Sequence, residues 1–280
     1  MELKDYVDAF EQSVRSLLAL LEPVDEADWA RPTELPGWSV HDVVSHLAAL
    51  ERELLGDPLP PAVDGYGSHV RSEFGQHMEN GVAARRTHSA AALTAELREA
   101  VDARLPEMRA MRADATPVRV VAGEPWDAEK LLRNRAFDAW MHEQDVRRAL
   151  TRPGNLDGRG ADVAMEILLG ALPFLVAKRA RATPGQSVRL EVTGVVAFTA
   201  TVRVGDDGRA ALATAPGISS ASSASSASAE AAEPTAVLRA DWETVVRLLG
   251  GRLSPNDAVV ELWGDTGLAR RLVDRLAVTP

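Results

Sequence analysis

The sequence predicts two domains, an all-α helical bundle over residues 1–153 and a smaller α+β domain over residues 154–280. In the first part, apolar residues recur at helical spacing in long segments joined mostly by short loops, as in a helical bundle. In the second part, short segments alternate apolar and polar residues, which is typical of strands with one buried face. A tract rich in Ser and Ala, about residues 216–233, lacks the residues needed for a core and is expected to be a flexible loop.

Five helices are expected in the first domain. The first ends at Pro23, and a loop over residues 32–37 precedes the second. Ser39 is a suitable N-cap for that second helix, and Asp42 three residues later completes a capping-box pattern. The expected helices are 3–21, 39–55, 70–88, 91–111 and 128–150, with a connector over 116–126.

The second domain is expected to open with a helix over residues 157–181 and to continue as a sheet. Val188, Leu190 and Val192 show the alternation of a half-buried strand, and the Gly-Asp-Asp-Gly sequence at 205–208 favours a hairpin turn. Short connections of this kind predict a mainly antiparallel sheet. The expected strands are 187–193, 195–204, 209–214, 235–240 and 258–263, with helices over 241–249 and 266–276.

The composition restricts the class of protein. The formal net charge is −10 and no Lys/Arg-rich block is present, so a nucleic-acid-binding surface is not expected. No apolar run reaches the roughly 18 to 20 residues that a membrane-spanning helix needs, and the N-terminus lacks the features of a signal peptide. We therefore expect a cytoplasmic protein without a membrane partner. The chain has no cysteine, which excludes a thiolate zinc site and requires any thiol chemistry to use a thiol from outside the protein.

Two distant segments contain residues typical of a metal site. Asp138 and His142 are four residues apart in the expected helix 128–150, so both side chains leave the same face. His46, in the expected helix 39–55, would add a second imidazole. Two imidazoles and one carboxylate are ligands typical of catalytic zinc sites, with one coordination position left open. Spacing alone also allows a simpler interpretation, in which Asp138 and His142 form an exposed pair and His46 is a hydrogen-bonded or surface histidine.

Asp145 lies on the same stripe of that helix, three residues after His142. Three roles are open to it. It would accept the second ring N–H of a metal-bound histidine, act as a catalytic base, or form an ion pair with Arg147 or Arg148.

Other acidic and histidine residues are weaker candidates. Glu51 and Glu143 are possible substitute carboxylates, but neither shares a face with His46 or His142 as well as Asp138 does. His41 falls in a first helical turn and is expected to be exposed. The histidines in or beside the third helix have no carboxylate at ligand spacing; these are His69, His77 and His88.

Two motifs resemble the mycothiol-dependent maleylpyruvate isomerase family. The first is Leu35-Pro-Gly-Trp-Ser-Val-His-Asp-Val-Val-Ser-His-Leu47, and the second is the segment 135–148, Arg-Ala-Phe-Asp-Ala-Trp-Met-His-Glu-Gln-Asp-Val-Arg-Arg. The resemblance implies a DinB-like four-helix bundle that binds a divalent metal, usually zinc, through His46, Asp138 and His142. The better-known isomerase has Glu where this chain has Asp138, and the shorter side chain still suits a metal.

The resemblance extends into the second domain and implies a further site residue. The segment 241–252, Asp-Trp-Glu-Thr-Val-Val-Arg-Leu-Leu-Gly-Gly-Arg, is similar to the sterol-carrier-like C-terminal domain of the family. In the family an arginine of this domain faces the metal cleft, so Arg252 is the candidate for contact with substrate or thiol. The same resemblance matches Asp145 to a recurrent aspartate of the family. The simpler interpretation of Arg252 is a cation at a helix C-terminus.

The resemblance also implies an activity. The protein is expected to be an enzyme that uses Zn²⁺ or another divalent metal and mycothiol, the low-molecular-weight thiol of actinobacteria, on a small-molecule electrophile. The reaction would be an isomerisation of maleylpyruvate type or an S-transfer, in a cleft between the two domains of a monomer or homodimer. Two alternatives stay open, namely a hydrolase that uses zinc-bound water and a non-catalytic protein that binds a metal or an apolar ligand.

Overall fold

The structure, a computed structural model, describes residues 1–114, 119–121, 124–215 and 233–279. The chain divides into two compact units, Met1–Val163 and Ala164–Pro280. The first is helical apart from a small hairpin, and the second combines helices with a five-stranded sheet. The predicted fold class, a helical bundle followed by an α+β domain, is therefore confirmed. The Ser/Ala tract lies almost entirely outside the described residues.

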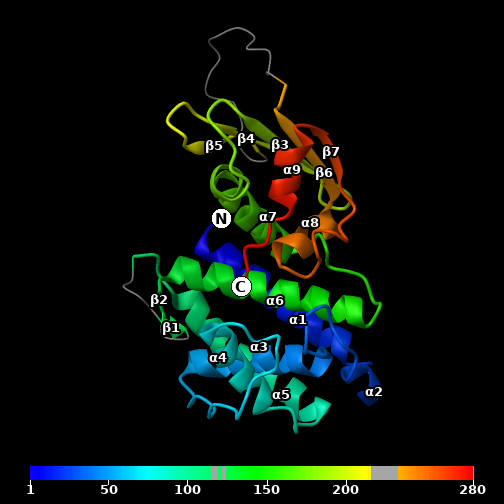
Figure 1. Ribbon diagram of the computed structural model, residues 1–280. Helices are drawn as coiled ribbons and strands as arrows, with labels where there is room; N and C mark the ends of the chain where they lie inside the picture. Colours follow the sequence, from blue (N-terminus) through cyan, green and yellow to red (C-terminus); the bar gives the residue numbers. More distant parts are fainter. Residues whose placement is uncertain (115–118, 122–123, 216–232, 280) are drawn as a thin grey trace. The chain divides into compact units, whose positions relative to one another are not determined.

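Four helices form the bundle of the N-terminal unit: α1 (Leu3–Leu21), α3 (Val40–Leu55), α5 (Ala90–Ala110) and α6 (Ala128–Ala149). Helix α6 packs along α1, and α3 packs along α5, as Figure 1 shows. Each helix buries one apolar stripe in the shared core, as expected for amphipathic helices. The core includes Phe10, Leu17, Leu47, Leu97, Leu131 and Trp140.

The shorter elements of this unit differ from the prediction. Helix α4 (Glu73–Ala83) is shorter than the expected 70–88, because Ser72 caps its start by accepting a hydrogen bond from Gly75 N–H. A single turn, α2 (Glu26–Trp29), lies where a loop was expected. The expected connector contains a hairpin of β1 (Arg119–Val121) and β2 (Glu124–Trp126), whose three-residue strands are too short to show alternation in sequence.

The C-terminal unit contains most of helix α7 (Arg159–Phe174), which continues as one turn of π-helix over Leu175–Arg179. Pro173 has no N–H to donate and lies just before the π-helical turn, where Ala180 N–H bonds to Leu175 C=O at 2.7 Å. The segment Arg159–Arg179 is long and apolar enough to cross a membrane by length and composition, and 44% of its most apolar window is buried. Asp162 and Glu166 interrupt the segment, so it is not the continuous apolar run that the prediction excluded, and the core helix of a globular protein meets the same criterion.

The sheet of the C-terminal unit has the strand order β5-β4-β3-β6-β7. Neighbouring strands are antiparallel except for β3 and β6, which are parallel. The predicted strands are present, with later starts for β4 and β7. Alternate residues of β3, such as Leu190, are buried, as the pattern predicted. The elements are β3 (Ser187–Thr193), β4 (Phe198–Val204), β5 (Ala210–Thr214), β6 (Ala236–Asp241), β7 (Glu261–Gly264), α8 (Trp242–Leu249) and α9 (Thr266–Val273).

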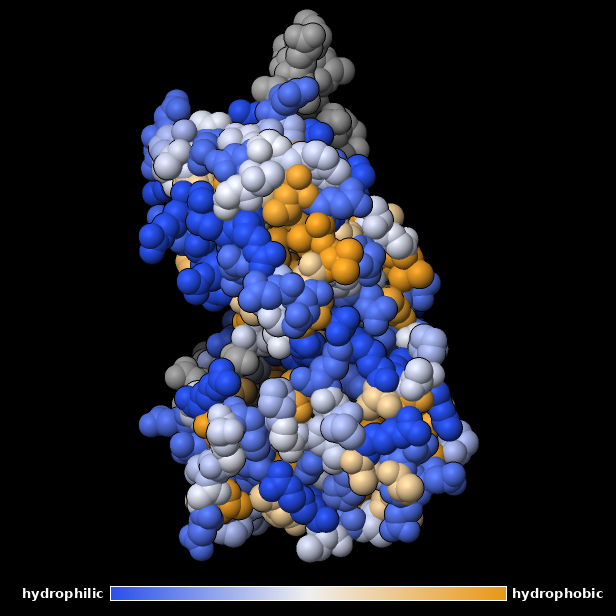
Figure 2. Space-filling view, turned by 45° about the vertical axis from the view of Figure 1, so that its right-hand side comes forward, coloured by the Kyte–Doolittle hydropathy of each residue, from blue (hydrophilic) through white to orange (hydrophobic). Residues whose placement is uncertain are grey.

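The surface of the C-terminal unit has an apolar feature. Figure 2 shows one face of the molecule, on which hydrophobic side chains gather in a patch on this unit. The large hydrophobic side chains that are exposed on this unit, on any of its faces, are Phe174, Val195, Val259 and Trp263.

Candidate metal centre

Helix α3 presents His46 to the interior of the bundle. Ser39 caps the helix by accepting a hydrogen bond from Asp42 N–H, and Asp42 accepts from Ser39 N–H at 2.9 Å, so the predicted capping box is present. The helix begins at Val40, and His46 lies in its second turn. Its side chain is buried, only 6% exposed.

Helix α6 presents the other two candidate ligands. Asp127 caps its start by accepting from Lys130 N–H, and the helix runs unbroken past Asp138 and His142. Because these two residues are one turn apart, their side chains lie side by side. His142 Nε2 is 3.4 Å from Asp138 Oδ1, and Asp138 Oδ2 is 3.4 Å from His46 Nε2. The structure thus brings the three predicted ligands together.

The geometry of His46, Asp138 and His142 suits one metal ion. Each offers a ligand atom, and these atoms all lie within 4.8 Å of one another. The Nε2 atom of His46 is buried and makes no hydrogen bond to any described residue. A buried polar atom without a partner is destabilising, and coordination to a metal would satisfy it. The donor set, two nitrogens and one carboxylate, fits Zn²⁺.

Burial and nearby charges shift the pKa values of all three candidate ligands. Burial by itself would raise the pKa of Asp138, but His142, Arg135 and His46 together hold it well below its usual value, so the carboxylate stays ionised. Burial lowers the pKa of His46 and keeps it neutral. Burial would lower the pKa of His142 as well, but Asp138 and Asp145 outweigh it and raise that pKa.

Asp145 supports His142 from behind. The side chain of Asp145 is fully buried, and its Oδ2 lies 3.1 Å from His142 Nδ1. An ionised carboxylate only accepts hydrogen bonds, so this contact favours a proton on Nδ1 and would leave Nε2 as the ligand atom of the neutral imidazole. Arg148 donates to the other oxygen of Asp145 at 2.9 Å. Two of the predicted roles of Asp145, histidine partner and ion-pair partner, therefore coexist.

Arg135 supports Asp138 in the same way. Its guanidinium is buried and donates to Asp138 Oδ2 and to Glu51, both at 2.8 Å. Glu51 also accepts from the fully buried Arg104 at 3.3 Å. Glu51 is thus a counter-ion for two arginines and not a substitute ligand. Arg133, two residues away, forms an ion pair with Glu129 on the helix surface.

Trp38 is a member of the site that the sequence did not reveal. Its ring centroid is 5.1 Å from that of His46 and 6.1 Å from that of His142, with the rings tilted by 40° and 34°. The only signal in the sequence is its place in the first family motif, after Pro36 and Gly37.

Arg252 belongs to the other compact unit. It follows helix α8, and its guanidinium donates to Gly250 C=O at 2.6 Å. The simpler interpretation, a cation that binds carbonyls at a helix end, describes this contact. Its contact with substrate or thiol stays a prediction.

The remaining histidines do not join the ligand cluster of the described residues. Three of them pair with carboxylates on other helices, at distances that sequence spacing cannot show. His77 Nε2 lies 2.8 Å from Glu53, which belongs to another helix and not to the ligand spacing considered in the sequence. His41 is only partly exposed, because its Nε2 bonds to His88 C=O at 2.9 Å, so its predicted exposure is wrong. The other two pairs are His69–Glu79 and His88–Glu96.

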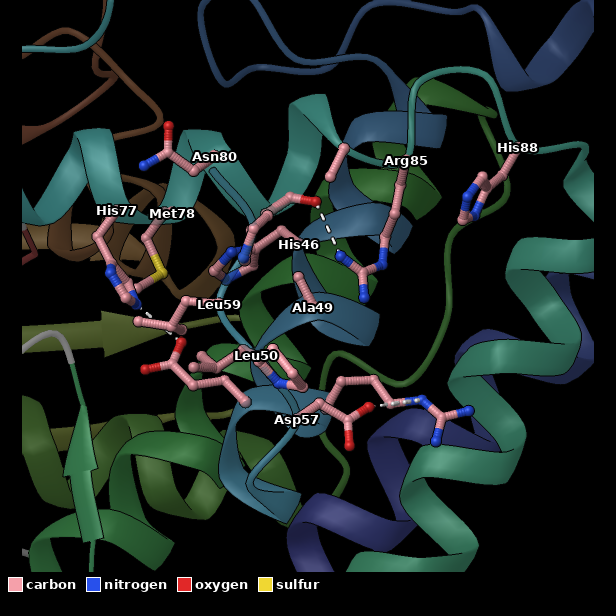
Figure 3. A pocket seen from close by; sticks show the side chains of 16 residues that line it. His46, Ala49, Leu50, Asp57, Leu59, His77, Met78, Asn80, Arg85 and His88 are labelled. Atoms are coloured by element: carbon pink, nitrogen blue, oxygen red, sulfur yellow. Dashed lines mark hydrogen bonds and ion pairs between the residues drawn. The ribbon is translucent and has the colours of Figure 1, made fainter. Parts of the chain in front are cut away.

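A pocket of about 390 Å³ lies between α3, residues 57–60 and α4, and His46 forms part of its wall (Figure 3). Its apolar lining includes Leu50, Leu59 and Met78. Polar side chains also line it, among them Arg85, which donates to Gly81 C=O at 3.0 Å. A cavity inside the N-terminal unit therefore reaches one of the three candidate ligands.

Known proteins resemble the chain in both units. The profile of the mycothiol maleylpyruvate isomerase N-terminal domain matches residues 10–147, and that of the C-terminal domain of the same protein matches residues 162–271. Among curated proteins, no sequence matches the chain.

Two solved structures resemble the whole chain. One is a crystal structure of the mycothiol-dependent maleylpyruvate isomerase, with 18% identity and a TM-score of 0.53. The other, a histidine-to-alanine variant under the same protein name, has 16% identity and a TM-score of 0.54. Each likeness covers 93% of this chain and 93% of the other, so the fold is shared from end to end. The two domain profiles together match most of the chain, and the chain belongs to the mycothiol-dependent maleylpyruvate isomerase family.

Proposed function

We propose that this protein is a metal-dependent enzyme that uses mycothiol as thiol cofactor or co-substrate. His46, Asp138 and His142 would hold one divalent metal, with Zn²⁺ as the first candidate. The main support is the cluster of three ligand atoms within 4.8 Å that includes the buried, unbonded Nε2 of His46. Family membership supports the thiol, and the absence of cysteine means that this thiol comes from outside the chain.

Each residue of the proposed centre would have a separate role. A bound Zn²⁺ would favour the thiolate form of the incoming thiol, which is the nucleophilic form. Asp138 supplies negative charge, and His46 stays neutral because burial lowers its pKa. Asp145 fixes the tautomer of His142 and, because its side chain is fully buried, acts as a positioning residue and not as a base that touches the substrate.

Two reaction types are compatible with this centre. In an isomerisation, the thiolate adds to the carbon–carbon double bond of maleylpyruvate, the resulting single bond rotates, and elimination of the thiolate gives fumarylpyruvate. In an S-transfer, the thiolate attacks an electrophile and remains attached to it. The names of the structural neighbours support the first type. We favour isomerisation, in the cytoplasm, where thiols are kept reduced.

Arg252 is proposed as a further contact for anionic groups of substrate or thiol. Its support is the family resemblance of the segment 241–252. Arg252→Ala is expected to raise KM or lower kcat without changing the metal content, because the residue belongs to a different compact unit from the ligands.

The deciding experiment measures metal content and thiol dependence together. Elemental analysis of the purified protein should give about one zinc per chain, and His46→Ala and His142→Ala should each lose it. His88→Ala is the control, because His88 is an exposed histidine of the same unit outside the ligand cluster. Turnover of maleylpyruvate should require mycothiol. Turnover without thiol would support a hydrolase instead, and a wild type that stays metal-free after zinc addition would refute the enzyme proposal.

A further inference from the structure

Trp38 lies against both imidazoles of the metal centre and leads to a second layer of contacts. The indole is half-buried, and its ring covers His46 and His142 at centroid distances of 5.1 Å and 6.1 Å. An aromatic ring in this place limits the rotation of the imidazoles only if the ring itself is fixed. The contacts of the indole N–H therefore matter for the ligand geometry.

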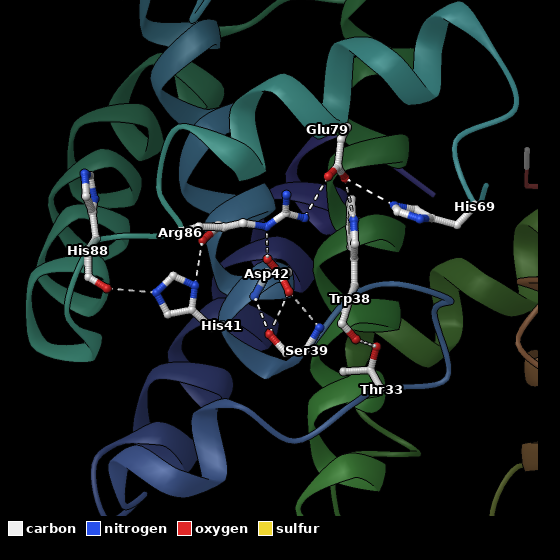
Figure 4. A network of polar contacts seen from close by, with 10 residues as sticks. Thr33, Trp38, Ser39, His41, Asp42, His69, Glu79, Arg86 and His88 are labelled. Carbon is white, nitrogen blue, oxygen red and sulfur yellow. Dashed lines mark hydrogen bonds and ion pairs between the residues drawn. The ribbon is translucent and has the colours of Figure 1, made fainter. Parts of the chain in front are cut away.

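Glu79 fixes the indole. This residue of α4 is 4% exposed, and its Oε2 accepts a hydrogen bond from Trp38 Nε1 at 2.9 Å (Figure 4). Arg86 donates to the other oxygen at 2.7 Å and to Asp42 of the α3 capping box at 3.1 Å. The buried carboxylate is thus balanced by a cation that also bonds to the start of the helix of His46. Such charge-assisted bonds are stronger and more directional than neutral ones.

His69 closes the same network from the loop before α4. Its Nε2 is 3.5 Å from Glu79 Oε2. A Cβ atom added to Gly37 would lie 2.5 Å from the imidazole of His69, and one added to Gly67 would lie 2.6 Å from it. The ring therefore packs directly on two glycines, one of which immediately precedes Trp38. Larger residues at either glycine would displace it.

We propose that Glu79 is a positioning residue of the metal centre. It holds the indole of Trp38 against His46 and His142, and through that ring it keeps the two imidazoles in the orientation that coordination requires. This role rests on the proposed metal site. Residues that hydrogen-bond directly to metal ligands are typically worth about 10- to 100-fold in metal affinity, and Glu79 acts one contact further out.

The test measures Co²⁺ and Zn²⁺ binding by the full chain, by absorption spectroscopy and chelator competition. Glu79→Leu should weaken binding up to about 10-fold, the lower end of the range for direct partners of metal ligands, and change the Co²⁺ absorption spectrum. Glu79→Gln keeps an acceptor of the same shape and should restore most of the affinity. The matched control is Glu53→Leu, because Glu53 also links α3 to α4, through His77, but does not contact Trp38. It should leave the spectrum unchanged.

A double-mutant cycle separates positioning from general damage. Trp38→Phe removes the indole N–H and should weaken binding in the same direction. If Glu79 acts through Trp38, adding Glu79→Leu to Trp38→Phe causes no further loss, whereas independent effects would add. Additive losses, or wild-type affinity in Glu79→Leu, would overturn this proposal while the metal site stands. A wild type that binds neither metal would overturn the proposed function and this role with it.

Discussion

The N-terminal unit buries charge, and the C-terminal unit buries almost none. Among the described residues, the buried polar side chains of the C-terminal unit are the uncharged Ser187 and Thr244. Those of the N-terminal unit include carboxylates, guanidinium groups and imidazoles on three of the four bundle helices and on α4; the charged or titratable ones are Asp42, His46, Glu51, Glu79, Arg104, Arg135, His142, Glu143 and Asp145.

The buried charges of the N-terminal unit are not explained by the needs of folding. Both units have an apolar core, so neither needs buried charge to fold. Taking a charge out of water costs several kcal/mol per ion unless it is well paired, so nearly every buried charge of the bundle has an opposite partner. Two of these networks reach the imidazoles, one through Arg135 and Asp138 and the other through Glu79 and Trp38. The comparison leads to predictions that run from the largest expected effect to the smallest.

Removing a buried cation from the N-terminal unit should lower the free energy of unfolding more than removing an exposed cation from the C-terminal unit. Arg135→Met leaves Glu51 and Asp138 without their shared guanidinium and should cost about 3–5 kcal/mol. Arg239→Met removes a 44%-exposed arginine from the sheet and should cost less than about 1 kcal/mol. Urea unfolding measures both, and equal losses would contradict the comparison.

Apolar truncations should affect the two units alike. Leu238 in β6 and Leu47 in α3 are both fully buried. Replacing either with Ala leaves a cavity and should lower the free energy of unfolding by about 2–5 kcal/mol. Thermal or urea unfolding of each variant gives the loss. If the leucine of the bundle proved dispensable, the packing of the two units would differ as well as their charge.

Zinc should stabilise one unit only. At a free concentration 100-fold above Kd, the metal should raise the unfolding free energy of the N-terminal unit by about 2.7 kcal/mol. Calorimetry with zinc and with a chelator measures the shift, and Asp138→Ala should abolish it. A shift that persists in this variant would place the ion elsewhere.

The metal affinity should depend on pH in a direction fixed by His142. Coordination needs the neutral imidazole, and the raised pKa of His142 makes a proton compete early as the pH falls. Affinity should therefore be full above that pKa and fall about tenfold per pH unit below it.

Asp145→Asn tests the cause of that pH dependence. It removes an anion that raises the pKa of His142, so the fall should begin at lower pH. The plateau at high pH should also drop about 10- to 100-fold, because the imidazole loses its orienting partner. Chelator competition across a pH series checks both, and an unchanged onset would assign the raised pKa to Asp138 alone.

Removing a helix cap should cause the smallest loss of stability, and the loss should be about the same in both units. Ser39→Ala and Asp241→Ala each remove a side chain that accepts from the first turn of a helix, in α3 and α8 respectively. Each should cost about 1 kcal/mol. A much larger loss for Ser39→Ala in the metal-bound protein, seen in unfolding experiments, would show that the capping box also supports the proposed centre.

The sequence predicted what depends on local spacing. The interval between Asp138 and His142 is a property of one helix, and the capping pattern of Ser39 fixed the start of another, so the ligand set followed once the family motifs were recognised. The strands of the second unit followed from alternation in the same way.

The support of the ligands depends on contacts between distant segments, which spacing cannot show. Glu51 and Arg135 are 84 residues apart, and Trp38 and Glu79 are 41 apart. The two family motifs contain Trp38 and Arg135 but neither Glu79 nor Glu51. The short hairpin of β1 and β2 was missed because three residues are too few for a period.

The pairing of β3 with β6 bears on the order in which the two units form during synthesis. Ser187 and Thr235, which bond to each other where β3 and β6 begin, are 48 residues apart in sequence. Both strands follow the bundle helices in the sequence, so they are synthesised after them. Chains fold domain by domain from the N-terminus during synthesis. Every side chain of the proposed centre precedes residue 146, so a nascent chain can assemble and load the centre before the ribosome has made β6.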